Sequence, residues 1–169
     1  MKSSAKDQVV MLDTSFLIRL MKDNDPLHKA AVDYYEYLLE KEYVLYVSTI
    51  ALAEYCVKGK LEQIPFDNLR VVPFNLDHSS VAGEFAASLY AAREKGEFIP
   101  DQRLIIPNDT KIFAQAASIN AVYLVTADTK SGKAMSKLSE TNQFKAQHLD
   151  IHKSVSEAFS LLLFESEEA

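Results

Sequence analysis

The chain has 169 residues, of which 48% are hydrophobic and 25% are charged, and its formal net charge at pH 7 is −6. This length and composition are typical of one globular domain that buries a core of its own. The negative charge argues against a protein that coats nucleic acid non-specifically. It does not exclude an enzyme that acts on nucleic acid, because such an enzyme depends on the local field of one groove.

The sequence favours a reducing, cytoplasmic compartment. Cys56 is the one cysteine, so no internal disulfide forms, and its place in an apolar run predicts a small buried side chain. The N-terminal residues MKSSAKDQ lack the apolar segment of a signal peptide. No run of residues reaches the length of an apolar membrane span, so no membrane partner is expected.

The first 60 residues predict two strands and three helices. The run VVML is continuously apolar, which is typical of a strand buried on both faces of a sheet. Helices are expected where apolar residues recur every three or four positions. In chain order we expect a strand over 9–12, a helix over 16–22 capped by Thr14 or Ser15, a helix from Pro26 to Glu40, a strand over 44–47, and a helix from its cap Ser48 to Lys58 that Gly59 ends.

The rest of the chain continues this alternation. Pro73 favours an edge position for the strand that contains it, and residues 98–107, with two prolines, are expected to be irregular. In chain order we expect a strand over 70–74, a helix from its cap Asp77 to Lys95 that Gly96 stops, a helix from Asn108 or Asp109 to Asn120, a strand over 121–126, a helix over about 131–140, either a strand or more helix near 145–151, and a helix over about 153–164.

Strands that alternate with helices predict an α/β fold with three layers, α/β/α, and a central, mostly parallel sheet of four to five strands. We expect a single domain over residues 9–164, preceded by a tail at 1–8 and followed by the acidic tail ESEEA at 165–169. In such sheets, ligands bind beyond the carboxyl ends of the strands. That rim is therefore where functional residues are expected.

Four acidic residues from distant segments are expected at this rim. They are Asp13 at the end of the first strand, Glu54 in the helix after the second strand, Asp109 at the start of the helix before the fourth strand, and Asp128 in the turn after it. Three of them also have a plainer interpretation. Asp13 and Asp109 are good helix caps, and Asp128 suits an ordinary turn.

Glu54 fits the plainer interpretations least well. Its spacing places it on one helix face with Ile50, Val57 and Leu61. It lies six residues after Ser48, too far for the third position of a capping box. A glutamate on an apolar face usually has a paired charge or a metal ion, so Glu54 favours a functional site.

Four clustered carboxylates repel one another unless a cation neutralises them. No His or Cys joins the set, and ligands that are all oxygen select Mg²⁺ or Mn²⁺. Such a site suits phosphoryl chemistry, in which the ion activates a water molecule for in-line attack and stabilises the leaving oxygen. The expected partner of Asp13 is therefore the other three acids, through a metal ion.

Three segments in this order resemble a PIN domain: VVMLDTSFLI, STIALAEYCVKG and PNDTKIFAQAASINAVYLVTAD, over residues 9 to about 140. The acidic positions of the family match Asp13, Glu54, Asp109 and Asp128 one for one, and Thr126 also fits its pattern. The resemblance implies a five-stranded parallel sheet and a metal-dependent endoribonuclease, similar to the VapC-type toxins of bacterial toxin–antitoxin pairs. It implies an RNA substrate and an antitoxin whose segment occupies the groove and blocks cleavage, and we also expect a homodimer.

The chain departs from the family pattern at Lys130, where a further acid is common. This change either leaves one tightly bound ion or lets Lys130 contact a substrate phosphate. Lys130, Lys133 and Lys137 are candidate contacts to the RNA backbone, or else form a solvated helix face. Thr14 and Ser15 are expected either to hold Asp13 or a metal-bound water, or to cap the helix.

The segment 96–107 is long for a minimal toxin, and a dimer contact, a substrate loop and a lid are its alternative roles. Two other functions remain open. A phosphatase like the haloacid dehalogenases also has an Asp after its first strand, but it needs a second Asp two residues later, where this chain has Ser15. A catalytically silent PIN domain that serves as a protein- or RNA-binding scaffold is the other alternative.

Overall fold

The computed structural model describes residues 8–97 and 105–160, except for the side chains of 105–107. Most of the expected N-terminal tail, most of the segment 96–107, and everything after residue 160 lie outside the described residues. The predicted end of the domain at 164 and the acidic tail are among them.

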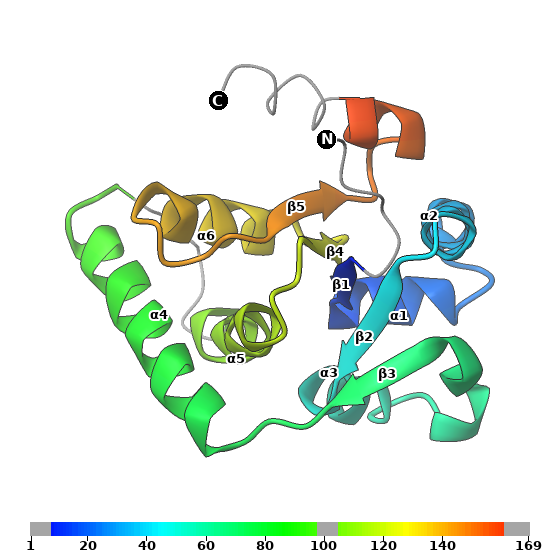
Figure 1. Ribbon diagram of the computed structural model, residues 1–169, viewed down its shortest axis with the longest axis horizontal. Helices are drawn as coiled ribbons and strands as arrows, with labels where there is room; N and C mark the ends of the chain where they lie inside the picture. The colour runs from blue at the N-terminus through cyan, green and yellow to red at the C-terminus, as the bar shows by residue number, and fades with distance from the viewer. Residues whose placement is uncertain (1–7, 98–104, 161–169) are drawn as a thin grey trace.

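Five parallel strands form one sheet in the order β3-β2-β1-β4-β5 (Figure 1). Leu12 at the end of the central strand pairs with Val47 on one side and Val125 on the other. The predicted α/β fold is confirmed, and the segment near 145–151 is a strand. The strands are β1 (Val9–Leu12), β2 (Val44–Ser48), β3 (Leu69–Val72), β4 (Tyr123–Thr126) and β5 (Gln147–Asp150).

Helices cover both faces of the sheet and make the expected three layers (Figure 1). On one face α1 contacts α2 and α3, and on the other α5 contacts α4 and α6. Residues 155–160 are also helical, and two short 3₁₀ turns, η1 (Leu61–Gln63) and η2 (Phe66–Asn68), precede β3. The helices are α1 (Thr14–Leu20), α2 (His28–Glu40), α3 (Thr49–Tyr55), α4 (Leu76–Glu94), α5 (Ile105–Ser118) and α6 (Thr129–Glu140).

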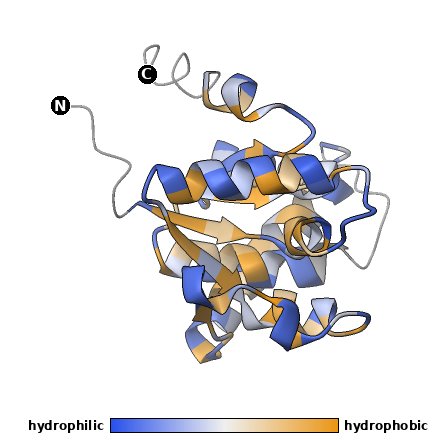
Figure 2. Cartoon of the chain, turned by 90° about the vertical axis from the view of Figure 1, so that its right-hand side faces the viewer, coloured by the Kyte–Doolittle hydropathy of each residue, from blue (hydrophilic) through white to orange (hydrophobic). Residues whose placement is uncertain are grey.

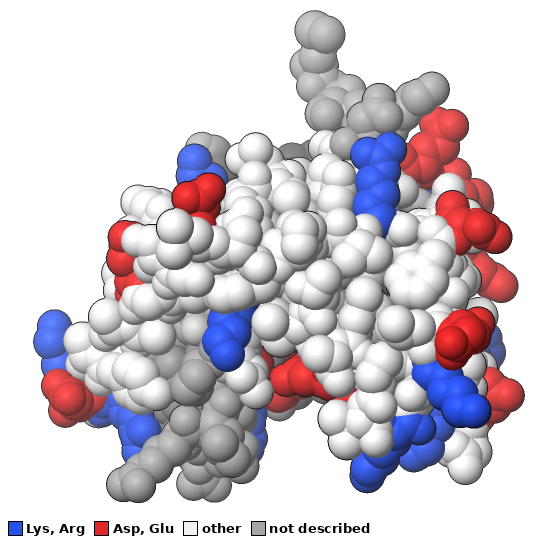
Figure 3. Space-filling model, turned by 90° about the horizontal axis from the view of Figure 1, so that it is seen from below, with Lys and Arg blue, Asp and Glu red and all other residues white. Residues whose placement is uncertain are grey.

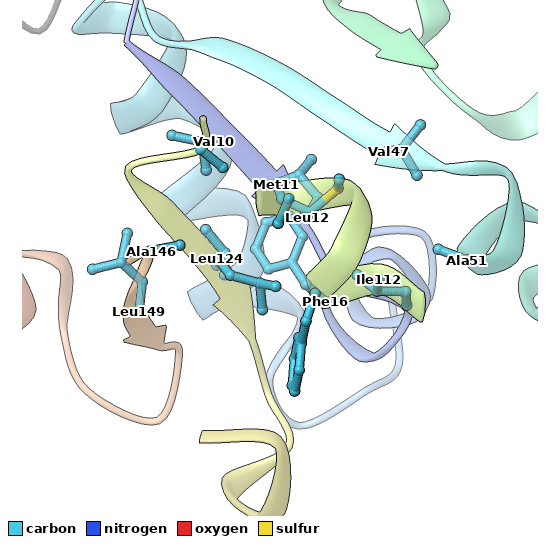
Figure 4. Packing of buried hydrophobic residues seen from close by; sticks show 14 of the residues in the cluster. Val10, Met11, Leu12, Phe16, Val47, Ala51, Ile112, Leu124, Ala146 and Leu149 are labelled. Carbon is cyan, nitrogen blue, oxygen red and sulfur yellow. The ribbon is translucent and has the colours of Figure 1, made fainter. Parts of the chain in front are cut away.

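The core lies on both sides of the central strands. Val10, Met11 and Leu12 have no exposed surface, as their continuous apolar run predicts. Figure 4 shows Phe16 of α1 and Ile112 of α5 packed around β1 and β4, and Figure 2 shows the apolar strands enclosed by more hydrophilic helices. Full burial of one such side chain contributes about 1.5–3 kcal/mol, so this core holds the ends of β1 and β4 in a fixed relation.

Several helix starts differ from those predicted; α2, for example, begins at His28 rather than at Pro26. The N-cap of α4 is Asn75, whose side chain accepts a hydrogen bond from the His78 N–H at 3.0 Å, so Asp77 already lies in the first turn. Helix α5 begins at Ile105, and Asp109 lies inside it rather than at its cap. Pro107 does not delay this start, because a proline in the first helical turn removes no hydrogen bond from the helix.

The edge position of the strand near Pro73 is confirmed, since β3 is the outermost strand on its side. The prediction for Cys56 is wrong: helix α3 ends at Tyr55, and Cys56 is exposed at its C-cap. Among the described residues, no helix is both long enough and apolar enough to cross a membrane.

Candidate functional site

The strand order places a crevice beyond β1 and β4. The chain leaves β1 towards β2 and β3 and later returns to β4 on the other side of β1. The carboxyl ends of two such strands form the usual ligand site of an open α/β sheet. Asp13 follows β1 directly, and its N–H donates to the Val125 carbonyl of β4 at 3.0 Å.

Asp13 is buried among hydroxyl groups. Its Oδ2 accepts hydrogen bonds from Ser15 Oγ at 2.7 Å and from Thr126 Oγ1 at 2.8 Å. The same oxygen accepts from the Ser15 N–H, so Asp13, not Thr14 or Ser15, is the N-cap of α1. Ser15 Oγ also accepts from the Ala127 N–H at 2.9 Å. The carboxylate therefore caps the helix and is held in one orientation just after the end of β1.

Glu54 connects three helices. Its Oε2 accepts a hydrogen bond from the Thr14 hydroxyl of α1, and its Oε1 accepts from Asn108 Nδ2 of α5 at 3.2 Å. The predicted apolar face around Glu54 is wrong, because Val57 and Leu61 are 76% and 44% exposed. Both lie after the end of α3, so helical spacing no longer relates them to Glu54.

Asp109 is the acid whose ionisation the fold disfavours most clearly. Burial, together with the negative charges of Asp13, Asp128 and Glu54, raises its pKa to about 7. The Ser131 hydroxyl opposes this rise by donating to Asp109 Oδ2 at 2.5 Å. The structure therefore places Asp109 within electrostatic range of the other three predicted acids.

Asp128 caps α6, where its Oδ1 accepts from the Lys130 N–H at 2.8 Å. Its own N–H donates to Thr126 Oγ1 at 2.9 Å, which ties it to the group around Asp13. The plainer interpretation of Asp128 is an ordinary turn, whereas the structure makes it a helix cap, which holds the carboxylate after the end of β4.

The lysines after Asp128 do not neutralise the acids. In residues 8–97 and 105–160, no Lys or Arg forms an ion pair with Asp13, Glu54, Asp109 or Asp128; the described ion pairs all lie elsewhere. Lys130 is half-buried and Lys133 is exposed. Lys137 instead pairs with Glu97 and Glu140, so its predicted contact to RNA competes with these carboxylates.

The chemistry of these side chains fits a hard divalent cation. The donors are carboxylate and hydroxyl oxygens, which Mg²⁺ and Mn²⁺ prefer, and their negative charge has no paired cation among the described side chains. Hydroxyl, amide and backbone N–H groups donate hydrogen bonds to these carboxylates. Within the described part of the chain, no three His, Cys, Asp or Glu side chains converge closely enough to hold one ion.

A groove of about 730 Å³ extends from Glu54 and Thr14 between α1 and the end of α3. Ile18, Met21 and Val57 give it an apolar floor, and Lys22 and Lys58 also line it. This groove joins two of the site residues to an open, partly apolar surface. Its volume lies within the range of about 300–1,000 Å³ that is usual for ligand pockets in proteins.

Two polar residues of the site were not found from the sequence. Ser131 holds Asp109 and Asn108 holds Glu54, each across two helices. The sequence pattern presents Asn108 only as a possible start of a helix. Ser131 has no sequence signal except its position three residues after Asp128, one turn along α6.

The PIN domain family model matches residues 10–137 of this chain. Two solved structures share its fold: VapBC2 from Rickettsia felis, bound to a DNA fragment from its promoter, and VapC20 from Mycobacterium tuberculosis, a toxin that cleaves the sarcin–ricin loop. The first is 23% identical with a TM-score of 0.55, covering 85% of this chain and 100% of that chain. The second is 18% identical with a TM-score of 0.51, and the match covers 72% of this chain and 92% of that chain. No curated protein sequence matches this chain significantly.

Proposed function

The chain belongs to the PIN domain family, and we propose that it is a metal-dependent endoribonuclease that hydrolyses RNA phosphodiester bonds, the toxin of a toxin–antitoxin pair. One observation carries the proposal. Near the sheet's switch point, burial and the charges of Asp13 after β1, Asp128 at the cap of α6 and Glu54 on α3 raise the pKa of Asp109 on α5 to about 7. Such an excess of charge favours a bound cation.

In this proposal Asp13, Glu54, Asp109 and Asp128 hold Mg²⁺ or Mn²⁺. A divalent ion bound there supplies a water of lowered pKa and stabilises the leaving oxygen. The chain's own hydroxyl groups orient the ligands. Ser15 and Thr126 hold the Asp13 carboxylate, and the Thr14 hydroxyl holds Glu54.

Basic side chains near the acids suit a phosphate backbone. Lys130 and Lys133 follow Asp128 on α6, and Lys22 and Lys58 line the groove beside Glu54. On the face in Figure 3, a group of Asp and Glu side chains lies set back, with Lys and Arg side chains on either side of it. We place the RNA strand across this face, with its scissile phosphate at the acids.

The toxin role rests on the family and on the fold shared with VapBC2 and VapC20. The partly apolar groove beside Glu54 is where we place an antitoxin segment, which would exclude RNA from the acids. A homodimer also belongs to this proposal. The phosphatase alternative is less well supported, because Ser15 fills the position of its second Asp and donates to Asp13.

The test is cleavage of a mixed RNA pool by the purified protein in Mg²⁺, in Mn²⁺ and in EDTA. We expect cleavage at discrete positions in either metal and none in EDTA. Binding of RNA without cleavage in either metal would favour the scaffold alternative. Cleavage that persists in EDTA would contradict the metal-dependent mechanism.

A further inference from the structure

Ser131 is a buried hydroxyl that connects two of the helices carrying the acids. It is 2% exposed and lies on α6, one turn after the cap Asp128. Its Oγ donates to Asp109 Oδ2 at 2.5 Å, across 22 residues of sequence. This hydrogen bond engages Oδ2 of the carboxylate and does not involve Oδ1.

The turn that carries Ser131 is fixed from two sides. Asp128 caps it through the Lys130 N–H, and Gly132 lies against the ring of His148 on β5. A Cβ at position 132 would lie 2.3 Å from His148 Cε1, so any larger residue would displace the His148 ring. The hydroxyl of Ser131 therefore points at Asp109 from a turn that is held by both its cap and the neighbouring strand.

We propose that Ser131 is a positioning residue, whose hydroxyl fixes the Asp109 carboxylate in the orientation in which it binds the divalent ion. This inference rests on the proposed function and deepens it. The hydrogen bond reaches Asp109 from a neighbouring helix, so it restrains the carboxylate as outer-shell partners restrain metal ligands. Losing a hydrogen-bond partner of a metal ligand typically weakens metal binding about 10–100-fold.

The test is titration of the purified protein with Mn²⁺ alone, by isothermal titration calorimetry, beside a thermal melt of each metal-free variant. We expect Ser131→Ala to weaken Mn²⁺ binding by at least about tenfold with little change in melting temperature. Ser131→Thr, which keeps a hydroxyl, should recover most of the affinity. Ser136→Ala, an exposed serine on the same helix, is the matched control and should bind like the wild type.

A second comparison separates positioning from a general structural effect. In an Asp109→Ala background, Ser131→Ala should cause no further loss of Mn²⁺ affinity, since Ser131 acts through Asp109. If Ser131→Ala does not fold, Ser131→Cys, which is of similar size and a weaker donor, replaces it and should also weaken binding.

The two proposals fail in different ways. A wild-type protein that binds no Mn²⁺ overturns the proposed function and this inference with it. A wild type that binds Mn²⁺, with a Ser131→Ala variant that binds it equally tightly, overturns the inference alone. If Ser131→Ala lowers the Mn²⁺ affinity by the same factor in the wild-type background and in the Asp109→Ala background, the positioning role is also overturned.

Discussion

The hydroxyl of Thr126 donates a 2.8 Å hydrogen bond to the carboxylate of Asp13, which joins the ends of β4 and β1 across 113 residues of sequence. Thr126 is completely buried, and the same oxygen accepts from the Asp128 N–H. One threonine therefore connects the first and the last acid of the site. This hydroxyl is therefore one of the contacts that hold the two carboxylates in relation to each other.

Thr126→Val tests the contribution of this hydroxyl to stability. Valine has nearly the same shape, so the packing of β4 is retained while Asp13 and the Asp128 N–H each lose a partner. We expect the free energy of unfolding to fall by about 1–3 kcal/mol, measured by urea denaturation. Thr129→Val, at an exposed position three residues later, should change it by less than about 0.5 kcal/mol. Equal effects of the two variants would contradict the assigned network.

The raised pKa of Asp109 predicts how stability depends on pH without metal. Between its ordinary value of 3.8 and about 7, the folded protein binds more protons at this carboxyl than the unfolded chain does. The free energy of unfolding therefore falls as pH rises through this window, and the loss is complete above about pH 7. Asp109→Asn, which carries no charge, removes this loss.

The measurement is urea denaturation in EDTA at pH 5 and pH 8. We expect Asp109→Asn to be more stable than the wild type by about 2–4 kcal/mol at pH 8 and by less at pH 5. Asp67→Asn, at an exposed position in η2, should follow the wild type at both pH values. A difference between Asp109→Asn and the wild type that does not change with pH would show that Asp109 ionises normally.

The contact between Gly132 and His148 predicts opposite effects for two glycine substitutions. Gly132→Ala places a Cβ against the His148 ring and should lower stability by about 1–3 kcal/mol. Gly83→Ala, on α4, meets no atom within 4 Å and should raise stability by up to about 1 kcal/mol. Thermal melts of both variants, and of Gly132→Ala combined with His148→Ala, check this. The double variant should recover part of the loss, and a failure to recover any would place the strain elsewhere.

A metal ion that binds only the folded protein must stabilise it. At a free Mn²⁺ concentration 100 times its Kd, the expected gain is about 2.7 kcal/mol, seen as a rise in melting temperature. The rise should disappear on addition of EDTA. A melting temperature that does not respond to Mn²⁺ would contradict a resident metal at these acids.

The sheet could be predicted because its strands are buried in a way that leaves a clear pattern. The run Val9–Leu12 is apolar on both faces, and the strands over 44–47 and 121–126 repeat the pattern. The rule that ligands bind at carboxyl ends then placed Asp13 and Asp128 at one rim, where the structure has them.

What failed were inferences that needed exact helix boundaries or contacts between helices. Val57 was placed beside Glu54 on the assumption that α3 continues past Tyr55, but the helix ends there. The expectation of an irregular segment over 98–107 puts Asp109 at a cap, but α5 begins at Ile105. The hydrogen bond from Ser131 to Asp109 depends on how α5 and α6 pack, which no local pattern encodes.

The most direct test of the central claim is the rate of RNA cleavage in Mn²⁺ by the wild type, by Asp13→Asn and by Asp67→Asn. Asparagine is nearly isosteric and can still accept from Ser15 and Thr126, so Asp13→Asn should fold with undiminished stability. We predict that it loses at least about 100-fold in rate, while Asp67→Asn cleaves like the wild type. A folded Asp13→Asn protein that cleaves RNA at the wild-type rate would contradict the assignment of the metal site.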